Sequence, residues 1–203
     1  MTYSKFNQIT VESVIKAYNY MSYPIFTKGD YNLNIFGIRN MKNVDANTFN
    51  DLIGLLYKVN GNWVLKKYDA TTDPGTKFRT SPVNIHGTAI LKEGYHRQGF
   101  KLGYHKGSYE ALQQNKPLPL YRDNNKDSHL DYDSPVIVEM AGINIHRGRK
   151  YGTTELVGPW SAGCQVIANS DDFDEFMTIV KKSAKIYGKT FSYALFTETQ
   201  FFA

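Results

Sequence analysis

The side chains best suited to chemistry in this sequence gather in two short stretches, Gly142–Arg149 and Gly158–Ile167. The second stretch holds Cys164, which is the single cysteine of the chain and therefore has no intramolecular disulfide partner. A lone cysteine is either a small buried apolar residue or a thiol kept for its reactivity. Ala162 and Gly163 precede it, and such small residues let a substrate approach the backbone and leave two N–H groups for an oxyanion. These neighbours favour a reactive thiol.

A histidine lies eighteen positions before this cysteine, at the end of the apolar run 136–145, which we expect to form a buried strand. If the segment around Cys164 forms an adjacent strand, the imidazole of His146 meets the sulfur. A neighbouring imidazolium lowers the pKa of a thiol and holds the thiolate ready to attack. Core packing is the alternative for each residue taken singly. We predict that Cys164 is a nucleophile and that His146 is its base.

His146, the loop after it and the sequence Ser161-Ala162-Gly163-Cys164 together resemble the active-site signature of the L,D-transpeptidase catalytic domain. The resemblance implies that Cys164 accepts the acyl group and that the backbone carbonyl of Arg147 holds the second ring nitrogen of His146. It also implies an oxyanion hole made by the N–H groups of Gly163 and Cys164.

Two positions depart from the family pattern. Ala162 stands where a second histidine is usual, and Gln165-Val166-Ile167 replaces a segment that usually carries Arg or Asn. We expect His105 to line the cleft in place of the missing histidine, with His86 as the alternative. The other expected substrate contacts are Tyr104, Trp160, Ser161 and Arg149, and a solvated loop is the alternative for the cations at Arg147, Arg149 and Lys150.

The length of 203 residues is enough for one sizeable core. We expect residues 1–60 to form an N-terminal extension of helix and strand packed on a catalytic domain at residues 61–203. The formal charge of +5 favours anionic partners such as the bacterial cell wall or nucleic acid. No nucleic-acid motif and no apolar run of membrane-spanning length occurs in the sequence, so neither nucleic-acid binding nor membrane insertion is expected.

The periodicity of apolar residues predicts an α+β protein with a mixed or antiparallel sheet, of L,D-transpeptidase type by the resemblance, and a few flanking helices. Helices are expected at 10–21, 47–59 and 170–187, and strands at 33–38, 63–70, 85–91, 100–105, 118–121 and 191–196. The Asn60-Gly61 pair predicts a turn.

The segment Asp123–Asp131 spaces oxygen-bearing side chains like the start of a calcium loop, but it has neither the glycine at the sixth position nor the glutamate at the twelfth. We therefore interpret it as a polar surface hairpin. The five histidines show no zinc-binding spacing, and neither a metal nor a cofactor is expected.

These features predict a cysteine peptidase that cleaves peptidoglycan stem peptides through a thioester, as a phage endolysin does. The alternatives are an L,D-transpeptidase that cross-links peptidoglycan and a non-catalytic wall-binding relative. The first residues lack an apolar segment typical of a secretory signal, so we expect a protein that is cytoplasmic as synthesised and reaches the wall after release. An export signal already removed would give the same beginning.

Overall fold

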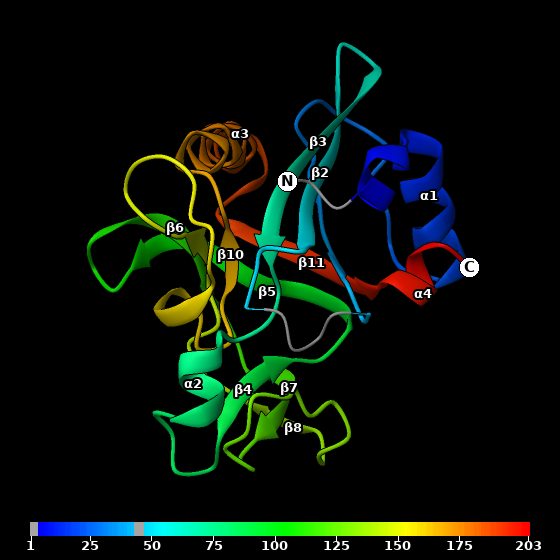
Figure 1. Cartoon of the computed structure of the whole chain (residues 1–203). Coiled ribbons are helices and arrows are strands. Elements are labelled where there is room, and N and C mark those ends of the chain that lie inside the picture. The colour runs from blue at the N-terminus through cyan, green and yellow to red at the C-terminus, as the bar shows by residue number, and fades with distance from the viewer. Residues whose placement is uncertain (1–3, 43–46) are drawn as a thin grey trace.

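The structure, a computed structural model, describes residues 4–42 and 47–203. It is an α+β protein in which eight strands close a mixed β-barrel and three further strands form an antiparallel sheet (Figure 1). The expected α+β class and mixed sheet are confirmed. Within the described ranges the elements are η1 (Ser4–Gln8), α1 (Val11–Tyr20), β1 (Asn34–Arg39), β2 (Asp51–Val59), β3 (Asn62–Thr71), α2 (Thr76–Thr80), β4 (Thr88–Leu91), β5 (Gly94–His105), β6 (Tyr109–Gln114), β7 (Leu118–Asp123), β8 (Ile137–Glu139), β9 (Ile145–Arg147), η2 (Gly158–Trp160), β10 (Gln165–Ile167), α3 (Ser170–Tyr187), β11 (Thr190–Thr197) and α4 (Glu198–Phe201).

The barrel strands follow the order β1-β11-β5-β6-β9-β10-β3-β2, so the first and last strands of the chain lie side by side. Two pairs, β1 with β11 and β9 with β10, are parallel. The predicted turn at Asn60 and Gly61 joins β2 to β3, and both residues have positive φ, as a two-residue hairpin requires. Residues 34–59, which were expected to lie in an N-terminal extension, thus supply two strands of the barrel.

The helix expected over 47–59 is wrong, because the chain forms β2 from Asp51 onward with its first seven residues buried. Ile53 belongs to the main core, whereas Leu52 and Leu56 pack in a second core beneath α1. Both faces of the strand are therefore apolar. Burial on both faces removes the alternation typical of a strand and leaves apolar residues at helical separations.

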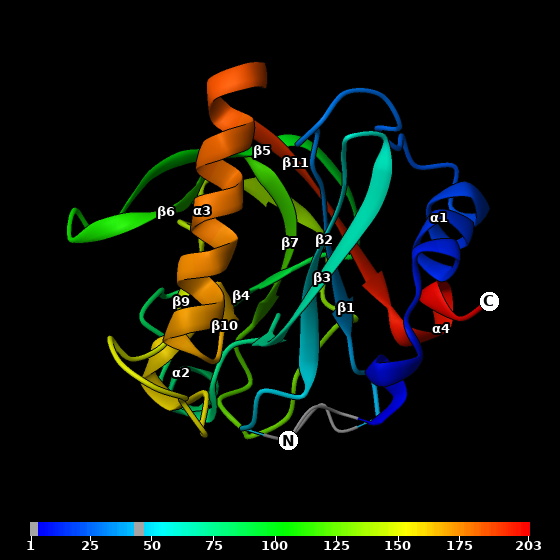
Figure 2. The same ribbon diagram turned by 90° about the horizontal axis from the view of Figure 1, so that it is seen from above.

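Two helices cover opposite sides of the β2–β3 hairpin, as Figures 1 and 2 both show. On one side, Phe173, Phe176 and Val180 of α3 are buried in the main core with the barrel strands. On the other side, Val14 and Tyr18 of α1 pack on β1, β2 and β11. Both helices were expected; Thr10 is the N-cap of α1, and Asn169 is the N-cap of α3.

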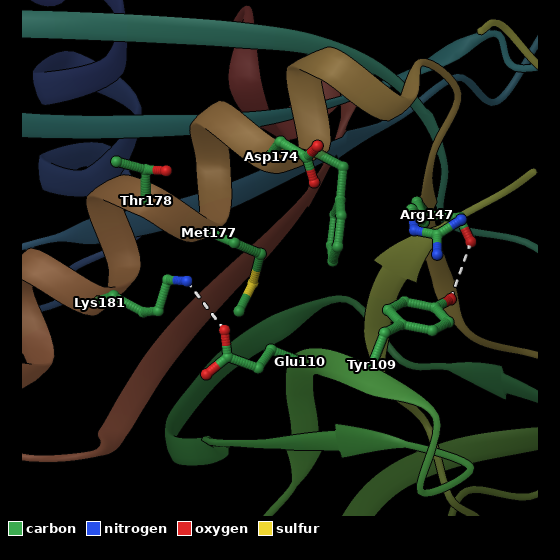
Figure 3. A pocket seen from close by; sticks show the side chains of 8 residues that line it. Tyr109, Glu110, Arg147, Asp174, Met177, Thr178 and Lys181 are labelled. Carbon is green, nitrogen blue, oxygen red and sulfur yellow. Dashed lines mark hydrogen bonds and ion pairs between the residues drawn. The ribbon is translucent and has the colours of Figure 1, made fainter. Parts of the chain in front are cut away.

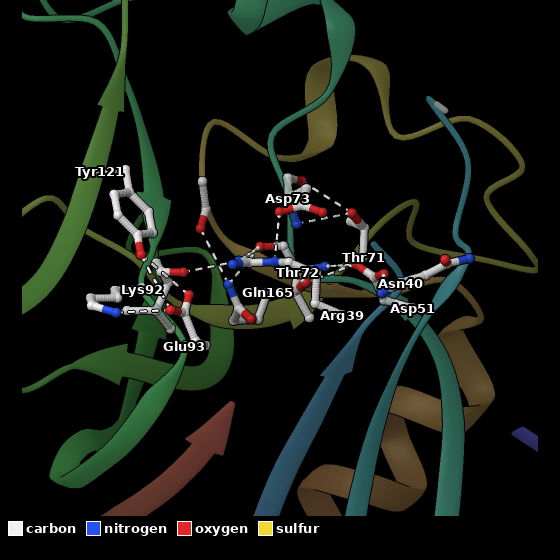
Figure 4. A network of polar contacts seen from close by, with 12 residues as sticks. Arg39, Asn40, Asp51, Thr71, Thr72, Asp73, Lys92, Glu93, Tyr121 and Gln165 are labelled. Atoms are coloured by element: carbon white, nitrogen blue, oxygen red, sulfur yellow. Dashed lines mark hydrogen bonds and ion pairs between the residues drawn. The ribbon is translucent and has the colours of Figure 1, made fainter. Parts of the chain in front are cut away.

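A buried ionic cluster joins the barrel to the three-stranded sheet (Figure 4). The guanidinium of Arg39 lies 2.9 Å from Asp73 and donates to the carbonyls of Thr72 and Leu91. Asp51 accepts hydrogen bonds from the backbone N–H and hydroxyl of Thr72. Burial and the nearby charge of Asp73 raise the pKa of Asp51 to about 7. Gln165, the residue after Cys164, also donates to the Thr72 carbonyl, so the cluster supports the start of β10.

The three-stranded sheet has the order β4-β7-β8 and contains two corrections to the expected strands. The strand expected at 85–91 begins only at Thr88, and Ile85 is 86% exposed in the preceding loop. The run 136–145 is not one buried strand, because it divides into β8 and β9, and Val138 is 66% exposed at the edge of the sheet. Within the described residues, no helix is both long and apolar enough to span a bilayer.

Candidate active site

The candidate site lies where β9 and β10 run side by side as parallel neighbours. Val166 pairs with His146, and the Gln165 N–H donates to the Asn144 carbonyl at 2.9 Å. Cys164 immediately precedes β10, and Asn144 immediately precedes β9. The prediction that the cysteine and histidine segments form adjacent strands is therefore confirmed.

Cys164 is partly exposed, and two backbone groups hold its sulfur. The N–H of Asn144 donates to Sγ at 3.4 Å, and the thiol donates to the Gly142 carbonyl at 3.6 Å. Burial of the sulfur raises the pKa of the thiol, and the Asn144 N–H offsets part of this shift because it stabilises a thiolate. Cys164 is thus a protonated thiol at neutral pH.

The orientation of His146 suits a base. Its Nδ1 lies 2.6 Å from the Arg147 carbonyl, and because a carbonyl only accepts, Nδ1 carries the proton. This contact confirms the expected role of the Arg147 backbone, and the Tyr109 hydroxyl lies 3.3 Å from the same nitrogen. Nε2 is buried and makes no hydrogen bond within the described part of the chain, so the neutral ring keeps a free lone pair there.

His105 reaches this site from the end of β5. Its ring stacks on that of His146, with centroids 3.9 Å apart and planes inclined by 24°. The side chain of Asn144 accepts from the Gln114 N–H through Oδ1, so its Nδ2 donates to Nδ1 of His105 at 3.1 Å. The neutral His105 ring therefore carries its proton on Nε2. These contacts place His105 beside the histidine segment and Asn144.

The thiolate–imidazolium pair expected from the sequence is not formed in this structure. Within residues 4–42 and 47–203, no hydrogen bond joins Cys164 to His146. Burial, reinforced by a positive charge on His105, lowers the pKa of His146 to about 3. A neutral thiol and a neutral imidazole therefore lie on neighbouring segments, and an attack by this sulfur on a substrate would require a proton transfer.

The turn before the cysteine differs from the expected oxyanion hole. Ser161 is fully buried, so instead of touching substrate it donates from Oγ to the Cys164 carbonyl at 2.7 Å. The same oxygen accepts from the Gly163 N–H at 3.2 Å, which occupies one of the two expected oxyanion donors. Gly163 itself has φ +117°, and a Cβ there would lie 2.3 Å from the Ala89 carbonyl oxygen. Only the N–H of Cys164 remains as an oxyanion donor from this turn.

For the residues that it describes, the structure shows no contact between the sulfur and the other expected substrate-binding residues. Trp160 is exposed on η2, and Tyr104 is 54% exposed on β5. Where the chain is described, neither makes a hydrogen bond or ring contact with Cys164 or His146. Arg149 is exposed in the loop after β9, and its backbone N–H donates to Thr154.

The segment Asp123–Asp131, which resembles the start of a calcium loop, begins at the last residue of β7 and continues as a surface loop. One of its carboxylates is buried. Asp123 is fully buried, and burial together with the charges of Asp131 and Asp127 raises its pKa to about 6. Across the described ranges, no group of three or more His, Cys, Asp or Glu side chains is arranged to hold a metal ion.

Two contributors to the site had no sequence signal that we recognised. Asn144 touches Cys164 through its backbone and His105 through its side chain, yet a lone asparagine between apolar residues predicts only a polar position. Tyr109 begins β6, a strand that the sequence analysis missed, and its hydroxyl donates to the Arg147 carbonyl at 3.3 Å. Burial raises the pKa of Tyr109 to about 12, so this hydroxyl stays protonated at neutral pH.

Comparison of the chain with protein-family models, with curated proteins and with solved structures finds no match.

Proposed function

We propose that this protein is a cysteine-dependent peptidase that cleaves stem peptides of peptidoglycan through a thioester. The observation that carries the proposal is the parallel pairing of β9 with β10, which places on neighbouring segments a partly exposed thiol and a histidine whose Nε2 has no hydrogen-bond partner among the described residues. The peptidoglycan substrate is suggested by the resemblance of His146 and Ser161-Ala162-Gly163-Cys164 to the L,D-transpeptidase signature.

In the first half of the proposed reaction, the thiol of Cys164 leaves the Gly142 carbonyl and gives its proton to Nε2 of His146. The sulfur attacks the carbonyl carbon of a peptide bond, and the carbonyl oxygen becomes an oxyanion near the Cys164 N–H. The Nε2–H of His105, with its orientation fixed by Asn144, is a second donor for this charge. The tetrahedral intermediate expels the amine, which takes the proton from His146, and an acyl-thioester remains.

In the second half, His146 takes a proton from water as the water oxygen attacks the thioester carbonyl. Expulsion of the sulfur, which recovers its proton from His146, releases the acid and restores the thiol. An amine in place of water would complete a transpeptidation by the same steps. We expect the protein to reach the wall by release, as a phage lysis protein does, and such a role favours hydrolysis over cross-linking. Hydrolysis is therefore the reaction that we propose.

A non-catalytic wall-binding relative is the second candidate. The contact between the thiol and the Gly142 carbonyl favours it, because the sulfur in this position is satisfied by backbone alone. Ala162, at a position where the family usually has histidine, points the same way.

Incubation with purified sacculi, followed by mass analysis of the released muropeptides, distinguishes these candidates. We expect new peptide fragments from the wild type and none from Cys164→Ala or His146→Gln. Lys185→Gln, which changes an exposed side chain near the end of α3, serves as a folding control and should release the same fragments as the wild type. Identical products from the wild type and Cys164→Ala would refute the catalytic proposal, and co-sedimentation of both with intact sacculi would support wall binding.

A further inference from the structure

A groove runs between α3 and the beginning of β6, and it adjoins the candidate site (Figure 3). Its volume is about 280 Å³. Apolar surface is supplied by Phe173 and Met177, and charged side chains surround it. The lining residues are Tyr109, Glu110, Arg147, Phe173, Asp174, Met177, Thr178 and Lys181.

Two of the four charged residues of this groove bind one another, and the other two have no such side-chain partner in the described ranges. Lys181 and Glu110 form an ion pair with a separation of 2.8 Å, which neutralises one end of the groove. Arg147 and Asp174 take part in no ion pair and no side-chain hydrogen bond within the described residues. One cationic and one anionic side chain therefore line the same small groove with their polar groups available.

Packing on Tyr109 fixes the guanidinium of Arg147. Its central carbon lies 4.1 Å from the centre of the Tyr109 ring, a cation–π contact that leaves the N–H groups at the edge of the guanidinium free to bind a carboxylate in bidentate fashion. Tyr109 and Arg147 also provide the hydroxyl and the carbonyl that contact Nδ1 of His146. The groove and the candidate base therefore share two residues, and a ligand in the groove lies beside the site.

We propose that this groove is a subsite for a zwitterionic amino-acid group, with its carboxylate on Arg147, its ammonium on Asp174 and its aliphatic part on Phe173 and Met177. The volume suits one amino-acid residue, and the two unpaired charges match the two charges of such a group. This proposal rests on the proposed function in one respect, since it assigns the group to the peptide whose carbonyl meets Cys164.

Binding of a small probe tests the subsite without catalysis. The probe is norleucine, a zwitterion with a four-carbon side chain, and it is added to Cys164→Ala protein that carries ¹³C-labelled methionine methyl groups. We expect a saturable shift of the Met177 methyl signal, which is assigned from its loss in Met177→Leu. Hexanoate carries only the carboxylate and pentylamine only the ammonium, and each should bind at least about fivefold more weakly, because each leaves one charged side chain without a partner.

Variants of the two free charges complete the test. Arg147→Gln and Asp174→Asn should each weaken norleucine binding at least about fivefold, whereas Lys185→Gln, which removes an exposed cation from the same helix, should not. Arg147→Lys keeps the charge and the fold, and it should bind with intermediate affinity because it lacks the planar fork. The absence of a saturable Met177 shift, or equal affinities for norleucine and hexanoate, would overturn the subsite. Failure of the sacculus assay alone would refute only the proposed reaction.

Discussion

The ring of His105 covers the ring of His146 at a centroid distance of 3.9 Å, so the candidate base is shielded by a second imidazole from a distant strand. This stacking acts on the titration of His146 in two ways. It contributes to the burial that lowers the pKa of His146 to about 3, and the positive charge of a protonated His105 is a second cause of that same shift. His105 therefore helps to keep His146 neutral over the physiological pH range.

Removal of His105 should restore a more ordinary titration of His146. In His105→Ala, the loss of cover and of a neighbouring positive charge both favour the imidazolium, so we expect the pKa of His146 to rise from about 3 towards the ordinary value of about 6.5. NMR titration of the His146 ring protons measures this change, with His129→Ala, a change at an exposed histidine, as the control. An unchanged His146 titration would show that the stacking has no electrostatic effect.

The alkylation of Cys164 should report a thiol and not a preformed ion pair. Because burial raises its pKa, the rate of reaction with iodoacetamide should rise with pH to a midpoint above the ordinary value of about 8.5. His146→Gln should leave this midpoint almost unchanged, since a neutral His146 does not stabilise the thiolate. No other cysteine competes for the reagent. A midpoint below 7 that rises in His146→Gln would instead demonstrate an ion pair.

Asn144→Ala should impair both the site and the fold. The change removes the donor that orients His105 and leaves the Gln114 N–H without its acceptor, which costs about 1–3 kcal/mol of unfolding free energy. Muropeptide release should fall by about tenfold or more, because the second oxyanion donor loses its orientation. Asn144→Asp keeps an acceptor for Gln114, so urea denaturation should find it more stable than Asn144→Ala. Equal losses of stability in the two variants would contradict this assignment.

Gly163 should tolerate alanine far less well than Gly142, although both have positive φ. At Gly142 a Cβ would meet nothing within 4 Å, so Gly142→Ala should cost only the backbone strain, about 1–2 kcal/mol. At Gly163 the Cβ would also clash with the Ala89 carbonyl, and we expect about 3 kcal/mol or more for Gly163→Ala. Thermal or urea unfolding of the pair measures the difference. Equal destabilisation of the two variants would mean that β4 moves away from the new Cβ at no cost in unfolding free energy.

The buried ionic cluster should make stability depend on pH through Asp51. Its folded pKa of about 7 lies above the unfolded value, so the folded protein binds the extra proton, and this contribution to stability is lost as the pH rises through 7. The stability of the wild type relative to Asp51→Asn should therefore fall between pH 5 and pH 8. Urea denaturation at a series of pH values gives this difference, and the other titrating groups cancel in it. A flat difference would show that Asp51 stays ionised throughout.

The sequence predicted the local parts of the site and suggested His105, but it indicated neither the contacts of His105 nor the presence of Tyr109, which both come from far along the chain. Cys164, His146 and the Arg147 carbonyl all belong to two short segments, and parallel pairing of those segments brings them together. His105 and Tyr109 lie 37 or more positions before the residues that they contact, in a hairpin whose second strand has no clear alternation. Contacts of this kind depend on strand order, which the pattern of apolar residues does not determine.

The wrong assignments of secondary structure have a similar cause. The periodicity of apolar residues reports how many faces of an element are buried, and β2 is buried on both faces, between the main core and α1. The amphipathic helices α1 and α3 bury one face each, and both were predicted. The turn at Asn60 and Gly61 was predictable because its backbone conformation requires such residues.

The hydrogen-bonded pairing of β9 with β10 and the turn at Ser161 and Gly163 position Cys164, whereas the exposed part of the connection around Arg149 and Tyr151 makes no contact with Cys164 or His146 within the described residues. If the proposed reaction takes place here, changes in the length or charge of that exposed part would alter which polymers approach and leave Cys164 and His146 in place. The proposed site would then separate reactivity from selectivity, and variation in one loop would be a route to new specificities.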